Sequence, residues 1–260
     1  SDRTEAFLSD HQGRDLRVEA ELALDAEGKF IGFRGSNISN VGAHTVSFVP
    51  LVKGVEIMSG TYRIPACFVR ARAAMTNTAS TSPYRSAGRP EVNFVIERLV
   101  DLASRETGID PVELRRRNLI PANAMPYANG LGMTYDSGDY RKVLDEALAL
   151  GDVDGFKARK AESAVRGKRR GLGIASYMET STGAPRERTE MSVVPPQRDE
   201  NGKGRIDVVI GTLSSGQGHE TSFAQLVTEW LDVDFDQVRL IQGDTDIVKF
   251  GGGSHSGRSM

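Results

Sequence analysis

The sequence has little of what membrane spans, disulfide frameworks or nucleic-acid surfaces require. No apolar run approaches the roughly 18 residues of a membrane span, and the first residues lack the basic-then-apolar layout of a signal peptide. The single cysteine, Cys67, excludes an intrachain disulfide and indicates a reducing compartment such as the cytoplasm. The formal net charge of -2, with 33 Lys and Arg against 35 Asp and Glu, argues against nucleic acid as the main partner.

Several common catalytic and metal-binding motifs are also absent. The four histidines lie far apart without paired spacing, so a zinc site is not expected. Gly167-Lys168 has Glu162 where a Walker phosphate loop needs glycine. Residue 256 is serine where the nucleophile elbow of a serine hydrolase, read around Ser254, needs glycine. The sequence therefore predicts no metal held by its own side chains.

What is present is the composition of a globular protein, 38% hydrophobic and 26% charged over 260 residues. Hydrophobic periodicity predicts helices and strands in an irregular order. The expected strands are 17–24 and 30–34, joined as a hairpin, then 67–74, 171–178, 206–210 and 238–241. The expected helices are 91–106, 110–118, 139–150, 152–164 and 220–231, with a long loop at 121–139. This mixture predicts the α+β class, with mixed sheets, packed helices and room for local βαβ units.

The strongest local signal is the segment from Ile206 to Thr221, where a buried strand runs into a Gly/Ser-rich turn that opens a helix. Free backbone N–H groups and the positive end of the helix dipole would then face one spot, which favours an anion. The alternative is a plain strand–helix turn with Ser215 or His219 near the cap. A nicotinamide-binding turn is a further alternative, but Thr221 stands where that motif has its third glycine.

A second polar segment joins a strand to a helix and contains Arg85, Gly88, Arg89 and Pro90. An arginine at such a place suits an anionic substrate or a developing oxyanion, because its planar fork donates in fixed directions. The alternative is an arginine paired with a nearby acid such as Glu91. A third segment, residues 251–260, is rich in glycine and serine and could hold phosphate in backbone nests. After the strand expected at 171–178, Glu179 is expected to form a surface salt bridge.

Taken in order, these segments resemble the molybdopterin-binding region of molybdenum hydroxylase large subunits, the xanthine dehydrogenase, aldehyde oxidase and carbon monoxide dehydrogenase superfamily. The similar stretches cover nearly the whole chain: 3–14, 76–91, 111–119, 134–138, 216–220, 243–246 and 251–259. The resemblance implies parts of two molybdopterin-binding domains. The basic run at 166–170 marks the expected boundary, with residues 1–165 in the first domain and 166–260 in the second.

The resemblance also implies a function and a set of site residues. The function is oxidation of an aldehyde or N-heteroaromatic substrate with water as the oxygen source. The expected cofactor is molybdopterin as its molybdenum cytosine dinucleotide, and iron–sulfur and FAD subunits are the expected partners. Arg85 matches the catalytic arginine. The implied cofactor contacts are Gly216, Gln217, Gly218 and His219, followed by Ser256, Arg258 and Ser259, and the substrate loop adds Tyr84, Ser86 and Arg89.

Two departures from the family pattern limit these expectations. Copper-containing carbon monoxide dehydrogenases carry a cysteine one position after the matching arginine, whereas this chain has Ser86. A molybdenum–copper site is therefore not expected. The family's upstream glycine-rich loop would precede Ser1 and its catalytic glutamate would follow Met260, so we expect an internal segment that is inactive alone. A scaffold-like relative that binds no molybdenum remains an alternative.

Overall fold

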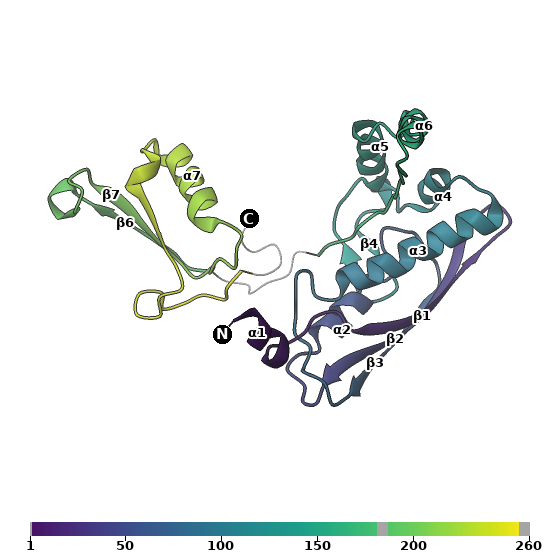
Figure 1. Cartoon of the computed structure of the whole chain (residues 1–260), viewed down its shortest axis with the longest axis horizontal. Helices are drawn as coiled ribbons and strands as arrows, with labels where there is room; N and C mark the ends of the chain where they lie inside the picture. Colours follow the sequence, from purple (N-terminus) through teal and green to yellow (C-terminus); the bar gives the residue numbers. More distant parts are fainter. Residues whose placement is uncertain (1, 181–186, 255–260) are drawn as a thin grey trace. The chain divides into compact units, whose positions relative to one another are not determined.

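The computed structural model describes residues 2–180 and 187–254, which divide between two compact units (Figure 1). The first unit is Ser1–Glu179 and the second is Thr180–Met260. Both contain strands and helices, so the predicted α+β class is confirmed. In the part of the chain that the structure describes, no helix has the length and apolar character needed to cross a membrane.

The first unit is built on a three-stranded sheet in the order β1-β2-β3. The predicted hairpin is confirmed: β1 (Leu16–Leu24) pairs antiparallel with β2 (Phe30–Gly42), which continues well beyond the predicted end. β3 (Cys67–Met75) runs parallel to β2. The long helix α3 (Arg89–Thr107) lies across one face of this sheet and α2 (Val49–Val55) packs beside it (Figure 1).

Three helices that follow α3 and a short hairpin also belong to the first unit. The helices are α4 (Pro111–Asn118), α5 (Tyr140–Leu150) and α6 (Phe156–Val165), and all three were predicted. Asp110 begins α4 by accepting hydrogen bonds from two backbone amides of its first turn, as its position before proline predicts. The loop expected at 121–139 contains the small hairpin β4–β5 (Tyr127–Ala128 and Thr134–Tyr135).

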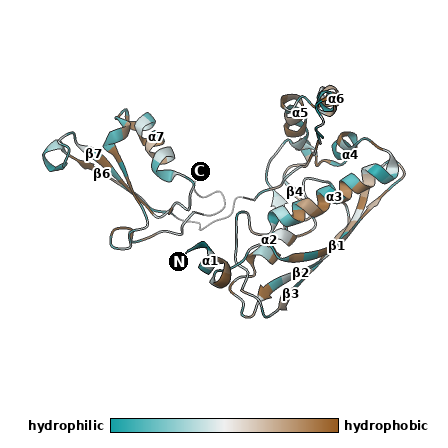
Figure 2. Ribbon diagram, in the orientation of Figure 1, coloured by the Kyte–Doolittle hydropathy of each residue, from teal (hydrophilic) through white to brown (hydrophobic). Residues whose placement is uncertain are grey.

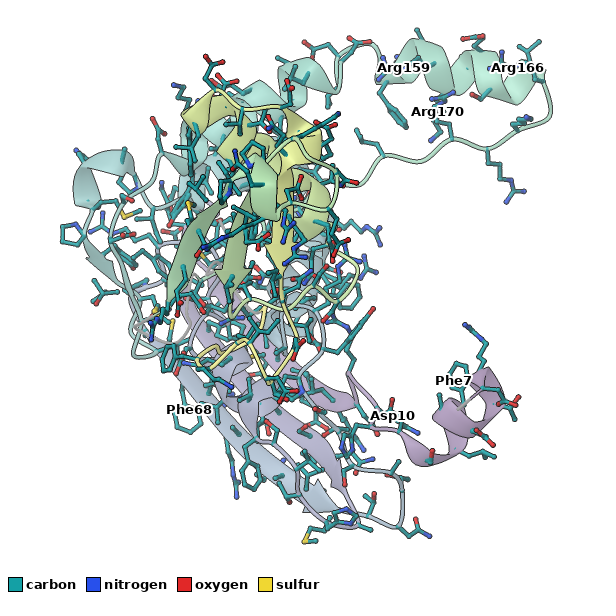
Figure 3. The ribbon with its side chains drawn as sticks, turned by 90° about the vertical axis from the view of Figure 1, so that its left-hand side faces the viewer. Phe7, Asp10, Phe68, Arg159, Arg166 and Arg170 are labelled. Carbon is teal, nitrogen blue, oxygen red and sulfur yellow. The ribbon has the colours of Figure 1, made fainter. Side chains whose placement is uncertain are left out.

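The basic run after α6 does not extend freely from the helix. The chain turns back, and the Arg170 guanidinium donates to the Ser163 hydroxyl at 3.0 Å (Figure 3). Arg166 pairs with Glu162 one helical turn earlier at 2.9 Å. The run is therefore an exposed turn fixed by local contacts.

The second unit is a three-stranded sheet covered by one helix. β6 (Thr189–Val194) pairs antiparallel with β7 (Arg205–Ile210), and β7 pairs parallel with β8 (Val238–Ile241). The helix α7 (His219–Leu231) connects β7 to β8, which makes the βαβ unit that the sequence allowed. The strands are largely hydrophobic, whereas the turn between β6 and β7 is hydrophilic (Figure 2).

The prediction of a strand at 171–178 is wrong. These residues form no strand pairing, and side chains of α3 and α4 bind the backbone of two of them. The Arg115 guanidinium donates to the Ile174 carbonyl at 2.9 Å, and the Asn93 carboxamide binds both backbone groups of Met178. The sequence patterns also missed α1 (Arg3–Ser9), α2 and β6. The units separate after Glu179 by packing, and the domain boundary after residue 165 stays a prediction.

Candidate functional site

The predicted site residues lie on two loops, one in each unit. The loop in the first unit leads from β3 to α3 and ends in four consecutive residues with positive φ: Arg85 at 28°, Ser86 at 71°, Ala87 at 37° and Gly88 at 91°. Such backbone costs a residue other than glycine roughly 1–3 kcal/mol, so it persists only where the surroundings hold it. We call residues 84–88 the left-handed loop.

Arg14 makes the first set of contacts to the left-handed loop. Its guanidinium donates to the carbonyls of Tyr84, at 3.4 Å, and of Arg85, and it lies 5.5 Å from the centre of the Tyr84 ring. The same guanidinium forms an ion pair with Glu91 at 2.9 Å. Glu91 is therefore occupied by Arg14, and the alternative in which it pairs with Arg85 is not observed.

A polar cluster around Glu179 makes the second set of contacts. Arg89 is buried, 4% exposed, and its guanidinium lies 3.0 Å from one carboxylate oxygen of Glu179. The other oxygen accepts from the Tyr177 hydroxyl at 2.8 Å and from the Ser86 hydroxyl, and these two hydroxyls are 2.7 Å apart. Burial, reinforced by the adjacent Glu179 carboxylate, raises the pKa of Tyr177, which keeps its hydroxyl a donor. Glu179 forms the expected salt bridge, but as part of this cluster.

The exposed Arg85 side chain differs from those of Arg14 and Arg89 because it has no partner in the described part of the chain. Among the described residues, its guanidinium makes no hydrogen bond or ion pair. Tyr84, beside it, is 61% exposed. Arg14 and the Glu179 cluster thus fix the loop and leave one cation available to a ligand.

The loop in the second unit leads from β7 into α7. Gly218 is the N-cap of α7, with φ at 75°, and no side chain caps the helix, so neither Ser215 nor His219 fills that role. The surroundings of Gly216 and Gly218 are open, with no atom within 4 Å of where a Cβ would stand. Free N–H groups of a first helical turn in open space suit an anionic group.

His219, the first residue of α7, is turned into the unit. It is 4% exposed, its Nδ1 lies 3.2 Å from the Thr212 carbonyl, and its ring stacks on Phe223 with centroids 4.6 Å apart. The neighbouring Gln217 accepts from the backbone amide of Ser215 through its side-chain oxygen. In this conformation His219 supports the turn through its ring, and its backbone N–H belongs to the open helix start.

The glycine-rich segment near residue 251 meets this turn. A Cβ on Gly211 would lie 2.2 Å from the Cα of Gly251, so the two backbones cross at a distance that only glycine permits. The amide of Gly253 donates to the Gly211 carbonyl at 3.1 Å, and the Ser254 hydroxyl lies 3.5 Å from His219 Nδ1. The structure thus brings two of the predicted cofactor segments together. The predicted contacts Ser256, Arg258 and Ser259 lie outside the described residues.

Gln242, at the end of β8, was not predicted as part of the site. Its side-chain oxygen accepts from the Ser214 amide at 3.0 Å, and its side-chain nitrogen contacts the Glu220 carboxylate in the first turn of α7. It therefore ties both ends of the glycine turn to the neighbouring strand. A glutamine 28 residues from its partner gives no local sequence signal.

Comparison with known proteins identifies the chain. Two family models, each described as a molybdopterin cofactor-binding domain, match residues 1–119 and 146–260. The chain belongs to the molybdopterin cofactor-binding domain family. It is 34% identical over 99% of its length to "6-hydroxypseudooxynicotine dehydrogenase complex subunit gamma" of Paenarthrobacter nicotinovorans, and 29% identical over 99% to "Carbon monoxide dehydrogenase large chain" of Hydrogenophaga pseudoflava.

Solved structures of this family agree with the sequence comparison. Quinoline 2-oxidoreductase from Pseudomonas putida 86 superposes with a TM-score of 0.84 at 30% identity, covering 99% of this chain and 34% of that one. The Cu,Mo-CO dehydrogenase gives a TM-score of 0.74 at 26% identity, covering 100% and 34%. The chain spans about a third of the length of these relatives, 32% and 34% for the two curated proteins. The resemblance to molybdenum hydroxylase large subunits is confirmed.

Proposed function

We propose that the chain is part of the catalytic subunit of a molybdenum hydroxylase that oxidises an aldehyde or an N-heteroaromatic compound with water as the oxygen source. The observation that carries the proposal is the contact between the Gly216–His219 turn and the Gly251–Ser254 segment inside a molybdopterin-binding domain. Relatives named for quinoline and nicotine, both N-heteroaromatic compounds, support this substrate class. Ser86, standing where a copper-binding enzyme has cysteine, argues against carbon monoxide as the substrate.

The second unit would bind the cofactor. A molybdopterin dinucleotide carries several negative charges, and the backbone amides of Gly216, Gln217 and Gly218, in a turn whose two glycines have open surroundings, would be donors suited to them. His219 would hold the turn in place, and Ser256, Arg258 and Ser259 are further proposed contacts. Once bound, the molybdenum cofactor supplies two-electron redox chemistry to the substrate carbon. We propose the cytosine dinucleotide form, with residues 1–165 and 166–260 belonging to the two molybdopterin-binding domains.

Arg85 would act on the substrate. Its exposed guanidinium can orient an electron-rich ring or carbonyl through directed N–H donors, and it can stabilise negative charge that develops there. Tyr84 would line the same side with an exposed aromatic ring. Ser86 and Arg89 would keep the loop in shape rather than contact substrate. Electrons would leave through iron–sulfur and FAD subunits of a cytoplasmic complex.

The test is the metal and nucleotide content of the full-length parent subunit, purified with its partners. We expect about one molybdenum per subunit and release of a cytosine nucleotide. A folded complex without molybdenum, made in a host that supplies the cofactor, would support the scaffold-like alternative instead.

Substitution tests the catalytic residue separately. We expect Arg85→Ala in the full subunit to lower turnover while leaving the molybdenum content intact, because Arg85 lies in the other unit from the proposed cofactor turn. Unchanged turnover would remove the catalytic role from Arg85. The 260-residue segment by itself is expected to be inactive.

A further inference from the structure

The left-handed loop depends on a carboxylate from a distant part of the sequence. Glu179 follows Ser86 by 93 residues, yet its carboxylate contacts the Ser86 hydroxyl, the Tyr177 hydroxyl and the Arg89 guanidinium. Arg89 in turn donates to the Ser86 carbonyl at 3.4 Å. Both the side chain and the backbone of Ser86, the residue after Arg85, are thus tied to one cluster.

We propose that Glu179 is a positioning residue that fixes the left-handed loop and thereby sets the direction in which the Arg85 side chain points. The inference rests on the proposed function, in which Arg85 acts on the substrate. Glu179 itself does not contact the substrate. Its effect passes through Ser86 and Arg89 to the backbone of Arg85.

The segment that carries Glu179 is itself held rigidly. Asn93 on α3 is 3% exposed; its carboxamide accepts from the Met178 amide at 3.0 Å and donates to the Met178 carbonyl at 3.2 Å. The same carboxamide donates to the Arg89 carbonyl at 2.8 Å. The backbones on both sides of the Arg89–Glu179 pair are therefore fixed to one buried side chain, which preorganises the carboxylate.

The geometry also explains why the Glu179 carboxylate should have a large effect on the left-handed loop. The loop has three residues other than glycine with positive φ, Arg85, Ser86 and Ala87, and such residues return to ordinary backbone when their contacts are lost. Arg14 holds the carbonyls of Tyr84 and Arg85, but no contact of Arg14 reaches Ser86 among those that the described residues make. Removal of Glu179 leaves the Ser86 hydroxyl without its carboxylate acceptor.

The test compares three variants of the full-length subunit in its complex. Glu179→Ala removes the carboxylate that accepts these hydrogen bonds. Glu179→Gln keeps the shape of the side chain, and its amide nitrogen can donate to the Ser86 and Tyr177 hydroxyls, which can accept as well as donate. Asp145→Ala is the matched control: Asp145 is 40% exposed against 42% for Glu179, lies in the same unit and pairs with two arginines, Arg116 and Arg141, away from the loop.

We expect Glu179→Ala to lower kcat about 100-fold, the scale of a misplaced orienting group, with molybdenum content unchanged. Glu179→Gln should recover most of that loss, and Asp145→Ala should leave kcat as in the wild type. In an Arg85→Ala background, Glu179→Ala should cause no further loss, because both changes remove the same interaction. Losses that multiply, or a loss equal to that of Asp145→Ala, would overturn the inference.

A readout independent of turnover separates this inference from the proposed function. Hydrogen exchange of the backbone amides of residues 84–89 should be faster in Glu179→Ala than in Asp145→Ala. A complex without molybdenum or turnover would contradict the proposed function and leave this measurement intact. Equal exchange in the two variants would contradict the positioning role even in an active enzyme.

Discussion

The two units hold their loops with different kinds of contact. The first unit has a large apolar core around α3. Beside it, ion pairs of charged side chains fix the left-handed loop. In the second unit, the buried apolar cluster contains four of the described residues, and the glycine turn lies beside a backbone crossing between Gly211 and Gly251. The proposed substrate loop thus depends mainly on charged side chains, whereas the proposed cofactor loop combines a close glycine crossing with contacts from the neutral side chains of His219 and Gln242.

The core of the first unit also contains ion pairs. Arg115 is fully buried and pairs with Glu97 at 2.8 Å and with Asp101 at 3.0 Å. The Tyr62 hydroxyl donates to the other oxygen of Glu97. Burial raises the pKa of the Glu97 carboxyl, and the neighbouring Arg115 opposes that shift. Arg115 also binds the Ile174 carbonyl, so it anchors the segment that leads to Glu179.

Arg115→Met should have the largest effect of the changes considered. It leaves Glu97 buried, 6% exposed, without its cation, and breaking a buried pair in this way costs about 3–5 kcal/mol. Denaturant unfolding followed by tyrosine absorbance measures it, since all six tyrosines precede residue 180. Arg98→Met, at an exposed position on α3, the helix that carries Glu97, is the control. Equal stability of the two variants would mean that the ion cluster adds nothing to the first unit.

Gly211→Ala tests the other half of the comparison. The new Cβ would meet the Gly251 Cα at 2.2 Å and the Phe250 carbonyl at 2.5 Å, and overpacking of this kind costs about 1–3 kcal/mol. We expect faster amide exchange in β7 and α7, with tyrosine-detected unfolding of the first unit unchanged. Gly173→Ala is the control, because a Cβ there meets nothing within 4 Å. Unchanged exchange in Gly211→Ala would refute the requirement for glycine at the crossing.

Local patterns in the sequence predicted the elements whose signals are local. The helix α3 has apolar residues at helical spacing and proline in its first turn, so its bounds were predicted within two residues. The hairpin β1–β2 follows from alternation on both sides of a polar turn. The segment 171–178 has the same apolar content as a strand, but long-range hydrogen bonds from Arg115 and Asn93 replace strand pairing. Local periodicity cannot distinguish these two outcomes.

The site residues likewise divide into those with a local sequence signal and those without one. Arg85 and the Gly216–His219 turn stood out because a polar segment followed a strand and preceded a helix. Arg14, by contrast, lies 70 residues from the carbonyl that it holds, and no spacing rule connects the two. Glu179 was expected only to form a surface salt bridge, and no local signal pointed to Ser86 and Arg89, its partners from another part of the chain. The residues proposed to bind substrate or cofactor thus have a local sequence signal, whereas the residues proposed to position them do not.

Gln242→Ala tests the side-chain contacts that hold the glycine turn of the second unit. It removes the acceptor of the Ser214 amide and the donor to Glu220, a loss of about 1 kcal/mol. Gln237→Ala is a matched control at the amino ends of the same strands, where its side chain donates to the carbonyls of Lys203 and Gly204. Both variants should lose similar stability, but only Gln242→Ala should lower the molybdenum content of the parent subunit. An equal lowering in both would show that Gln242 acts through general stability.

The smallest expected effect is a loss of stability at alkaline pH, and it is confined to the first unit. Burial of the Tyr140 phenol, with Tyr135 and Asp136 nearby, raises its pKa from 10.0 to about 12. The unfolded chain therefore ionises first, so the stability that Tyr140 contributes is complete below pH 10.0 and is lost as pH rises through about 12. Burial also raises the pKa of other tyrosines in this unit, Tyr62 among them, so Tyr140→Phe should remove one phenol from the late ionisation in the phenolate absorbance of the folded protein. The second unit has no tyrosine, so its amide exchange should not follow this transition. Ionisation of Tyr140 near pH 10 would mean that its ring is not held in the first unit's core.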